Sequence, residues 1–526
     1  MSAWSLYFLA KVALYYNHTI GLHLVLNALF AVALAWPLRA RALRIARHVV
    51  AVPIAVALLY YDSYLPPWNR VVDQLDVLSN FRADYLWELV QRFVSPLWVM
   101  VILVMIAVYA FLSHRVRFAT FAFLALGLAA VLPAGSVMPA STPDPAEFVR
   151  RGEAVPQEGP GPVLAKPALD SALDNGYNAA RGKIVSFAAA GIPRFDLVFL
   201  SICSLSNDDL DYVRMRDDPF LARFDVVFRH FDSAATYSGP AVLRLLHGTC
   251  GQTPQRELYS GTAADACYLF RNLAQAGYRP ALLLNHDGHF DNFAGQLRMQ
   301  GGIGADPDDN RSAPVAMTSF DGTPIRADFD LLSQWWKQHV FANADQHTML
   351  LYNTITLHDG NRVPGMAGSS SLQTYAPRLH RLFGDLGRFI DQIEASGRPT
   401  VVVLIPEHGA ALRGDAVQVA GLREIPTPAI TTVPAAVKLI GFGGVKKPGG
   451  TPLLVEQPSS YLGLMTLIAG LAQAGPVNET TESLQNLLRA LPSSEWIAEN
   501  EGTVFFRHGG RQYLRTPTGQ WNEFGE

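Results

Sequence analysis

The sequence predicts an α/β protein in two parts, with transmembrane helices first and a mostly parallel sheet covered by helices on both faces after them. The chain has 526 residues, which is too long for one ordinary domain. Long apolar stretches crowd into its first quarter. Further along, short β-branched runs alternate with amphipathic helical patterns, and that alternation favours an α/β/α sandwich.

The apolar stretches of the first quarter are each nearly long enough to cross a bilayer core of ~30 Å. Four such stretches occur, at residues 20–38, 49–65, 93–112 and 118–138. A shorter stretch at 4–16 carries Lys11 and is either a fifth span or a helix at the membrane interface. A plain anchor needs only one span, so four or five suggest a role in handling lipid or docking a membrane partner.

Basic residues predict how these spans are oriented. They cluster in the connections after the first and third strong spans, at Arg39, Arg41, Arg44 and Arg47 and at Arg115 and Arg117. By the positive-inside rule both connections face the cytoplasm. The large second part of the chain is therefore expected outside the cytoplasm.

Composition predicts three segments: a transmembrane domain at 1–138, a Pro/Gly-rich linker at 139–165, and one large folded domain at 166–526. The net charge of −3 argues against a nucleic-acid partner, which would require a basic surface.

Six short apolar runs predict the strands of the sheet. They lie at 195–203, 224–228, 281–285, 349–357, 401–405 and 437–440. An amphipathic pattern at 379–395 predicts one of the covering helices. The tail at 503–521 has apolar runs on both sides of Gly509-Gly510 and predicts a closing hairpin.

The three cysteines divide into a pair and one left over. Cys250 and Cys267 are close in sequence and lie in an expected oxidising compartment, so we favour a disulfide over two buried thiols. Cys203 is then unpaired, and it would be exposed to oxidation unless something, such as a metal, occupies its sulfur.

Polar side chains follow two of the predicted strands. Glu407 and His408 come directly after the run 400–405, and Cys203 ends the strand that begins the folded domain. Because open α/β sheets keep their sites at the carboxyl ends of strands, we expect the three side chains to face one crevice. Carboxylate, imidazole and thiolate all ligate Zn²⁺. The alternatives are a polar turn after one strand and a buried thiol at the end of the other.

Ser238 precedes Gly239-Pro240 at the start of a predicted helix. A serine here is a good helix N-cap. The same position suits a nucleophile, because the N–H groups of a helix start stabilise an attacking alkoxide and a bound phosphate. With metal ligands expected nearby, we favour the nucleophile.

Taken together, Cys203, Ser238 and the pair Glu407-His408 occur in an order that resembles the alkaline-phosphatase superfamily. Within it they resemble the membrane-anchored phosphoethanolamine transferases, which have N-terminal spans and an extracytoplasmic α/β domain with zinc at a Ser or Thr nucleophile. Most of those enzymes carry a carboxylate, Thr and Asp-His at these places. The Cys, Tyr-Ser and Glu-His variant, with the stretches 285–290, 357–361 and 421–426, resembles the transferases of bacterial cellulose-secretion operons along the full length.

The resemblance implies zinc held by Cys203, Glu407 and His408, with the Ser238 oxygen as fourth ligand. It also implies that the substrate pocket is lined by Tyr237, His358 and Arg423. Arg423 suits bidentate binding of phosphate, and its alternative is an ion pair with Glu424. His358 suits a hydrogen bond to the phosphoryl group or protonation of a leaving alkoxide, and its alternative is a turn. For His286 and His289 a turn role is as well supported as substrate contact.

The resemblance further implies a multi-pass protein of the bacterial inner membrane with a periplasmic catalytic domain. It would move phosphoethanolamine from phosphatidylethanolamine to the C6 hydroxyl of cellulose through a phosphoethanolamine-serine intermediate, beside cellulose synthase subunits. The alternatives are another acceptor (lipid A or a periplasmic glucan), a phosphodiesterase of the same fold, and a non-enzymatic scaffold. Trp335 and Trp336 could stack on sugar rings, but core packing is the better expectation for both.

Overall fold

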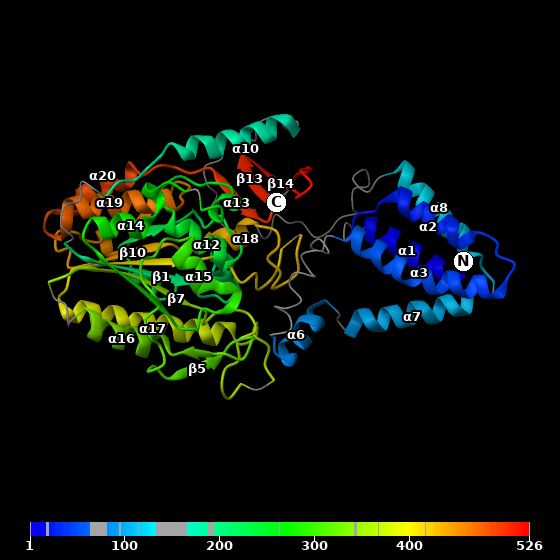
Figure 1. Ribbon diagram of the computed structural model, residues 1–526, viewed down its shortest axis with the longest axis horizontal. Helices are drawn as coiled ribbons and strands as arrows, with labels where there is room; N and C mark the ends of the chain where they lie inside the picture. Colours follow the sequence, from blue (N-terminus) through cyan, green and yellow to red (C-terminus); the bar gives the residue numbers. More distant parts are fainter. Residues whose placement is uncertain are drawn as a thin grey trace. The chain divides into compact units, whose positions relative to one another are not determined.

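The computed structural model (Figure 1) describes residues 2–16, 20–63, 81–93, 96–113, 115–132, 166–187, 194–261, 263–340, 345–366, 368–415 and 417–524. The chain forms two compact units. The first comprises Met1–Ser79 and Leu89–Pro156, and the second comprises Asn80–Glu88 and Gln157–Glu526. The predicted linker at 139–165 lies outside the described residues.

The first unit is helical. Its helices are α1 (Ser2–Tyr16), α2 (Leu24–Ala35), α3 (Arg41–Asp62), α7 (Pro96–Leu112) and α8 (Phe118–Val131), while α6 (Ala83–Phe93) begins in the second unit. Among the described residues, α3 is the one helix long and apolar enough to cross a membrane. Shorter apolar helices at Leu24–Ala35, Leu103–Leu112 and Phe118–Val131 lie within three of the predicted spans.

Helix α1 packs against α2 and α8, and it carries a charge into the interior of the first unit. Lys11 is 1% exposed and pairs with the buried carboxylate of Asp62 at the end of α3. Lys11 Nζ also donates to Asn27 Oδ1 at 2.8 Å. A buried ion pair needs such added hydrogen bonds to offset desolvation of its charges. The 4–16 stretch is therefore a helix that packs against the other helices of the first unit.

The second unit is built on a seven-stranded sheet in the order β11-β2-β10-β8-β1-β7-β4. The strands are β1 (Asp196–Ile202), β2 (Val226–Phe228), β4 (Arg279–Leu284), β7 (Thr348–Thr354), β8 (Thr400–Pro406), β10 (Ala436–Ile440) and β11 (Leu453–Val455). Strands β8, β1, β7 and β4 run parallel, and β10 is antiparallel to both of its neighbours. All six predicted strands are present, and the predicted mostly parallel sheet is confirmed.

Helices cover both faces of this sheet (Figure 1). In β1, Leu197 and Phe199 point into a core formed with α12 (Ser238–Leu246), α14 (Leu269–Gln275), α19 (Tyr461–Asn478) and α20 (Thr481–Arg489). Val198 and Leu200 point into the opposite core with α16 (Asp328–His339) and α17 (Tyr375–Ser396), the latter containing the predicted helix 379–395. A strand buried on both faces requires apolar residues at every position, which explains the continuous runs of the sequence.

Smaller elements complete the second unit. The helices are α10 (Lys166–Arg181), α11 (Asn207–Tyr212), α13 (Gln255–Leu258), α15 (Phe293–Met299) and α18 (Pro428–Thr431). The pairs β3 (Phe231–Asp232) with β9 (Thr432–Val433) and β5 (Val315–Thr318) with β6 (Pro324–Arg326) form two-stranded sheets. The predicted tail hairpin is β13 (Thr503–His508) with β14 (Arg511–Arg515), flanked by β12 (Trp496–Asn500) and β15 (Trp521–Glu523) in one antiparallel sheet.

The cysteines follow the predicted division. Cys250 and Cys267 form a disulfide that joins the loop after α12 to the segment before α14. Cys203 is the free cysteine of the described residues, and it is buried.

Candidate active site

Two adjacent parallel strands deliver the predicted metal ligands to one point. Cys203 directly follows β1, and Glu407 and His408 directly follow β8. The register pairs Ile202 with Pro406, so the three residues leave the sheet at the same level. One candidate ligand atom from each of Cys203, Glu407 and His408 lies within 4.8 Å of the other two, and all three residues are buried. The strand-end expectation therefore holds for their positions.

Ser238 reaches the same cluster from another element. It is the first residue of α12, and its Oγ lies 3.3 Å from Cys203 Sγ. Tyr237 occupies the N-cap position, and the side chain of Ser238 is not used as a cap. The Ser238 hydroxyl thus faces the candidate ligands while the helix start supplies N–H groups beside it.

The donor atoms of this cluster fit a metal ion. Glu407 Oε1 accepts from Ser201 Oγ at 2.9 Å and from Asn353 Nδ2. Oε2 is buried without a well-formed hydrogen bond among the described residues, although Ser238 and Cys203 face the same carboxylate. His408 Nδ1 lies 2.9 Å from the Gly409 carbonyl oxygen, which leaves Nε2 directed toward Cys203 Sγ at 3.9 Å. An orphaned carboxylate oxygen, an imidazole fixed through its other nitrogen and a thiol are a donor set for zinc.

Burial disfavours the charged forms that a metal requires. It raises the pKa of Cys203 to about 12, with the Glu407 carboxylate adding to the effect. Burial also raises the pKa of Glu407, whereas it lowers that of His408 well below its usual range and so favours the neutral imidazole that binds a metal. A divalent cation reverses this balance by favouring thiolate and carboxylate. The site without a cation is therefore electrostatically costly to ionise.

Arg423 adds a buried positive charge beside the cluster. Its Nη1 donates to Ser204 Oγ at 3.2 Å and lies 3.2 Å from His408 Nδ1. Burial lowers its pKa, but Tyr237, Cys203 and nearby acidic groups outweigh that effect and raise the pKa overall. Among the described residues it forms no ion pair, and the alternative of a pair with Glu424 is not what the structure shows.

Tyr237, the residue before Ser238, contacts both Arg423 and Glu424. The Arg423 guanidinium lies 5.2 Å from the centre of the Tyr237 ring. The Tyr237 hydroxyl donates to Glu424 Oε1 at 2.7 Å, and Asn500 Nδ2 donates to the Glu424 carbonyl oxygen at 2.9 Å. Glu424 therefore fixes the Tyr237 side chain through its hydroxyl. Because Glu424 does not pair with Arg423, the Arg423 guanidinium keeps N–H donors available for an anion.

His358 lies in the turn after β7, the neighbour of β1 in the sheet. Its Nδ1 is 2.6 Å from the Asp359 carbonyl oxygen, and its ring packs on Phe320 with centroids 4.7 Å apart. Burial and the Arg423 charge lower its pKa to about 4. His358 is therefore neutral at pH 7, and with Nδ1 donating to the carbonyl its Nε2 carries a lone pair.

The two remaining histidines differ from each other. His286 is buried, and its Nε2 donates to Asn353 Oδ1 at 3.0 Å. Asn353 in turn donates to Glu407, so His286 contacts the candidate ligand Glu407 only through Asn353. His289 has a side chain 89% exposed.

Asn353 and Ser201 were not predicted from the sequence. The feature that could have indicated them is a polar residue near the end of an otherwise apolar strand.

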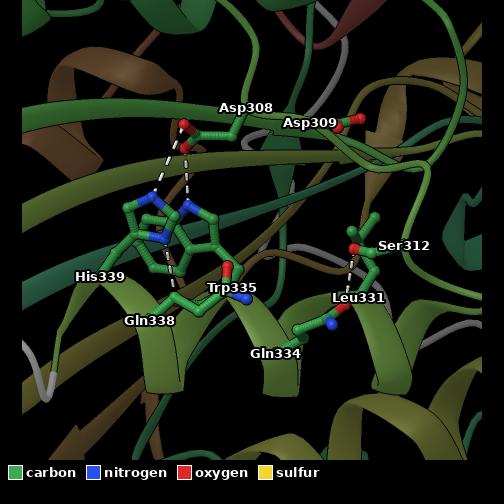
Figure 2. A pocket seen from close by; sticks show the side chains of 8 residues that line it. All are labelled: Asp308, Asp309, Ser312, Leu331, Gln334, Trp335, Gln338 and His339. Atoms are coloured by element: carbon green, nitrogen blue, oxygen red, sulfur yellow. Dashed lines mark hydrogen bonds and ion pairs between the residues drawn. The ribbon is translucent and has the colours of Figure 1, made fainter.

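A separate hollow of about 240 Å³ lies over α16 (Figure 2) and shares no residue with the cluster above. The ring of Trp335 stacks on His339 there, and its Nε1 donates to Asp308 Oδ2 at 2.6 Å. Trp335 is 3% exposed and Trp336 is fully buried. Core packing is therefore confirmed for both, and neither presents a ring face for a sugar.

Solved structures resemble part of this chain at low sequence identity. A protein of the alkaline phosphatase superfamily from Vibrio parahaemolyticus shares 14% identity over 67% of this chain and 87% of its own, with a TM-score of 0.49. The C-terminal periplasmic domain of EptC from Escherichia coli, solved in complex with Zn, shares 12% identity over 59% of this chain and 91% of its own, with a TM-score of 0.44.

Sequence comparison identifies the family. The profile for the C-terminal domain of cellulose biosynthesis protein BcsG matches residues 156–521, and the profile for its N-terminal domain matches residues 4–131. Cellulose biosynthesis protein BcsG of Escherichia coli K12 is 35% identical over 99% of this chain and 96% of its own length. The BcsG protein of Salmonella typhimurium LT2 is 34% identical with the same coverage. The chain therefore belongs to the BcsG family of cellulose biosynthesis proteins.

Proposed function

We propose that the protein is a zinc-dependent transferase that moves phosphoethanolamine from phosphatidylethanolamine to the C6 hydroxyl of cellulose glucose units. The observation that carries this proposal is the position of Ser238, whose Oγ lies 3.3 Å from Cys203 Sγ in the three-residue metal cluster. A hydroxyl at a helix start, beside metal ligands and a buried arginine, suits attack on phosphorus. Membership of a cellulose biosynthesis family supports cellulose as the proposed acceptor.

Cys203, Glu407 and His408 would hold the zinc, with Ser238 as fourth ligand. Bound there, zinc would lower the pKa of the Ser238 hydroxyl and offset negative charge near the phosphoryl group. The protein itself prepares the site by holding Glu407 through Ser201 and Asn353 and His408 through the Gly409 carbonyl.

The reaction proceeds in two displacements at phosphorus. Ser238 Oγ loses its proton and forms a bond to phosphorus, the bond to the diacylglycerol oxygen breaks, and that oxygen takes up a proton. The glucose C6 hydroxyl then attacks the phosphoethanolamine-Ser238 intermediate, loses its proton, and the bond between phosphorus and Ser238 Oγ breaks as Ser238 is reprotonated. His358, neutral with a free Nε2 lone pair, suits acceptance of a hydrogen bond from the C6 hydroxyl, which would orient that hydroxyl for attack.

Arg423 would bind the oxygens of the transferred group. Its guanidinium is buried, carries no carboxylate partner among the described residues, and lies over Tyr237. A planar fork of donors matches phosphate geometry, and burial strengthens its attraction for charge that develops during displacement.

The proposed setting is the bacterial inner membrane, with several spans and the second unit in the periplasm near cellulose synthase subunits. The basic connections at 39–47 and 115–117 support the orientation. The disulfide between Cys250 and Cys267 suits an oxidising compartment. A lipid donor is then available to an enzyme anchored in the same bilayer.

Intact-mass measurement of the zinc-loaded full chain in phosphatidylethanolamine vesicles tests this function. The wild type and a matched surface variant, Ser312→Ala, should gain one phosphoethanolamine, and Ser238→Ala should gain none. An adduct that persists in Ser238→Ala would show that the nucleophile is misassigned.

Membranes that also contain cellulose, lipid A and periplasmic glucan then identify the acceptor by which product gains phosphoethanolamine. Release of free phosphoethanolamine with no modified polymer would indicate a phosphodiesterase. Cellulose modification that survives in folded, membrane-inserted Ser238→Ala would indicate a scaffold instead of an enzyme.

A further inference from the structure

A short segment from the first third of the chain packs into the second unit beside His358. Residues 81–88 lie in sequence between α3 and α7, two apolar helices of the first unit, yet they belong to the second. Within the segment, Tyr85 is 6% exposed and Glu88 is 9% exposed. A stretch that connects two membrane helices has no need of buried polar side chains for that purpose alone.

The segment contributes both carboxylates that pair with Arg362. Asp84 Oδ2 lies 2.9 Å from Arg362 Nε, and Glu88 Oε2 lies 2.9 Å from Arg362 Nη2. Glu88 Oε1 also accepts from the backbone N–H and the hydroxyl of Ser371, at 3.0 and 2.7 Å. Among the described residues these are the ion pairs of Arg362, so the segment neutralises a charge that residues 157–526 leave without a carboxylate partner.

Tyr85 reaches the residue next to His358. Its hydroxyl donates to Asp359 Oδ2 at 3.0 Å, while the Ser371 hydroxyl lies between Asp359 Oδ1 and Glu88 Oε1 and shares its one proton between them. The Asp359 carbonyl is the group that fixes His358 Nδ1. Tyr85 therefore lies two contacts from the imidazole of His358, through a single residue.

Packing around the turn confirms that the segment is seated closely. Gly360 has a φ of 80°, and a Cβ at that position would come within 2.9 Å of the Tyr85 ring and within 2.6 Å of Phe320. Phe81 packs edge-on against Phe320 with ring centroids 5.2 Å apart, and Arg82 N–H donates to the Phe320 carbonyl at 3.0 Å. The ring of His358 also packs against Phe320. The turn at 358–362 is thus held between Phe320 and the segment.

We propose that residues 81–88 form one wall of the active site, and that Tyr85 is a positioning residue that holds the His358–Asp359 turn in its working geometry. The inference rests on the proposed function for its catalytic consequence. The active site is then completed by chain that lies in sequence between α3 and α7, so residues 157–526 alone lack a part of the machinery.

The first test is kinetic and uses the zinc-loaded full chain with a soluble aryl phosphoethanolamine diester as donor. Tyr85→Phe removes one hydroxyl and keeps the ring, and we expect turnover to fall about tenfold with the KM for the donor and the zinc content unchanged. Trp87→Phe, an exposed position of the same helix, is the matched control and should behave as wild type.

A double-mutant cycle separates positioning from general destabilisation. If Tyr85 acts through His358, then Tyr85→Phe should cost little more once His358→Gln is already present. The proposal would be overturned if the loss of turnover in the double variant equalled the product of the losses in the two single variants. Wild-type turnover in Tyr85→Phe would overturn it as well.

Hydrogen exchange provides a readout that needs no chemistry. In Tyr85→Phe and Glu88→Gln, amides of residues 355–363 should exchange faster, and amides of β1 should not change. If the wild type forms no Ser238 adduct, the proposed function fails, and exchange alone decides whether the segment holds the turn. Unchanged exchange in both variants would refute that role as well.

Discussion

Asn353 donates a hydrogen bond from its Nδ2 to Oε1 of Glu407, and this bond leaves the buried Oε2 without a well-formed partner. The pairing joins β7 to the end of β8 across β1, whose Ser201 donates to the same oxygen. Because Oε1 is committed to the protein, Oε2 is the oxygen presented to a metal. His286 fixes the amide of Asn353 from the other side, so the orientation of the carboxylate is determined by residues outside the cluster itself.

Replacing Asn353 should therefore weaken zinc binding without removing a ligand. We expect Asn353→Ala to lower zinc affinity about 10- to 100-fold, as is typical when a residue that orients a ligand is lost. Chelator competition on the purified full chain measures the affinity. Asn486→Ala, at an exposed position of α20, is the control. Equal affinity in Asn353→Ala and wild type would mean that Glu407 does not need this support.

Arg423 should be intolerant of lysine. Lysine keeps the charge but loses the planar fork, and each hydrogen bond to a charged group contributes about 1.5–3 kcal/mol. We expect Arg423→Lys to slow formation of the Ser238 adduct about 10- to 100-fold with zinc content unchanged. Time-resolved intact mass measures the rate. Arg413→Lys, which alters a surface pair with Asp208, should leave the rate near wild type, and a similar loss there would undercut the argument.

The disulfide should stabilise the second unit without supporting the metal site directly. Cys250 and Cys267 are 17 residues apart, and closing a loop of that length contributes about 3 kcal/mol. The double variant Cys250→Ala/Cys267→Ala should unfold at lower denaturant concentration and still bind zinc. Adding reductant should shift the wild type toward the variant and leave the variant itself unchanged. A variant with wild-type stability would contradict the prediction.

Local patterns predicted the sheet and the positions of Cys203, Glu407 and His408, because continuous apolar runs specify buried strands and a strand end fixes where the next residue points. Local patterns could not predict that residues 81–88 pack beside His358. Tyr85 and Asp359 are 274 positions apart, and nothing local in the 66–92 connection distinguishes a docked segment from a solvated loop. The role of Asn353 could not be predicted for a related reason. It depends on which strand lies beside β1, and strand order is a tertiary property.

The last prediction concerns Asp232. Its side-chain carboxyl group is buried, and the residue lies in the segment that leads to Ser238. It ends β3, is 1% exposed, and its Oδ1 accepts from Ala234 N–H at 2.8 Å. Ala234 has a φ of 58°, a conformation that a residue with a Cβ adopts at a cost, so the hydrogen bond helps to hold a strained turn. Burial raises the pKa of Asp232 to about 7.

The sign of the effect follows from that raised pKa. Between pH ~4 and ~7 the folded protein keeps the Asp232 proton while the unfolded chain has released it, so stability falls as pH rises through this window. Asparagine keeps an acceptor for Ala234 and cannot ionise. We therefore expect Asp232→Asn to match wild type near pH 4 and to exceed it at pH 8, by at most about 4 kcal/mol for a shift of about three pKa units. Denaturant midpoints of the chain from pH 4 to 8 measure the difference, with the exposed Asp217→Asn as control. A variant that is less stable than wild type by a margin that grows as the pH rises would show that the negative charge itself supports the turn, and would refute the prediction.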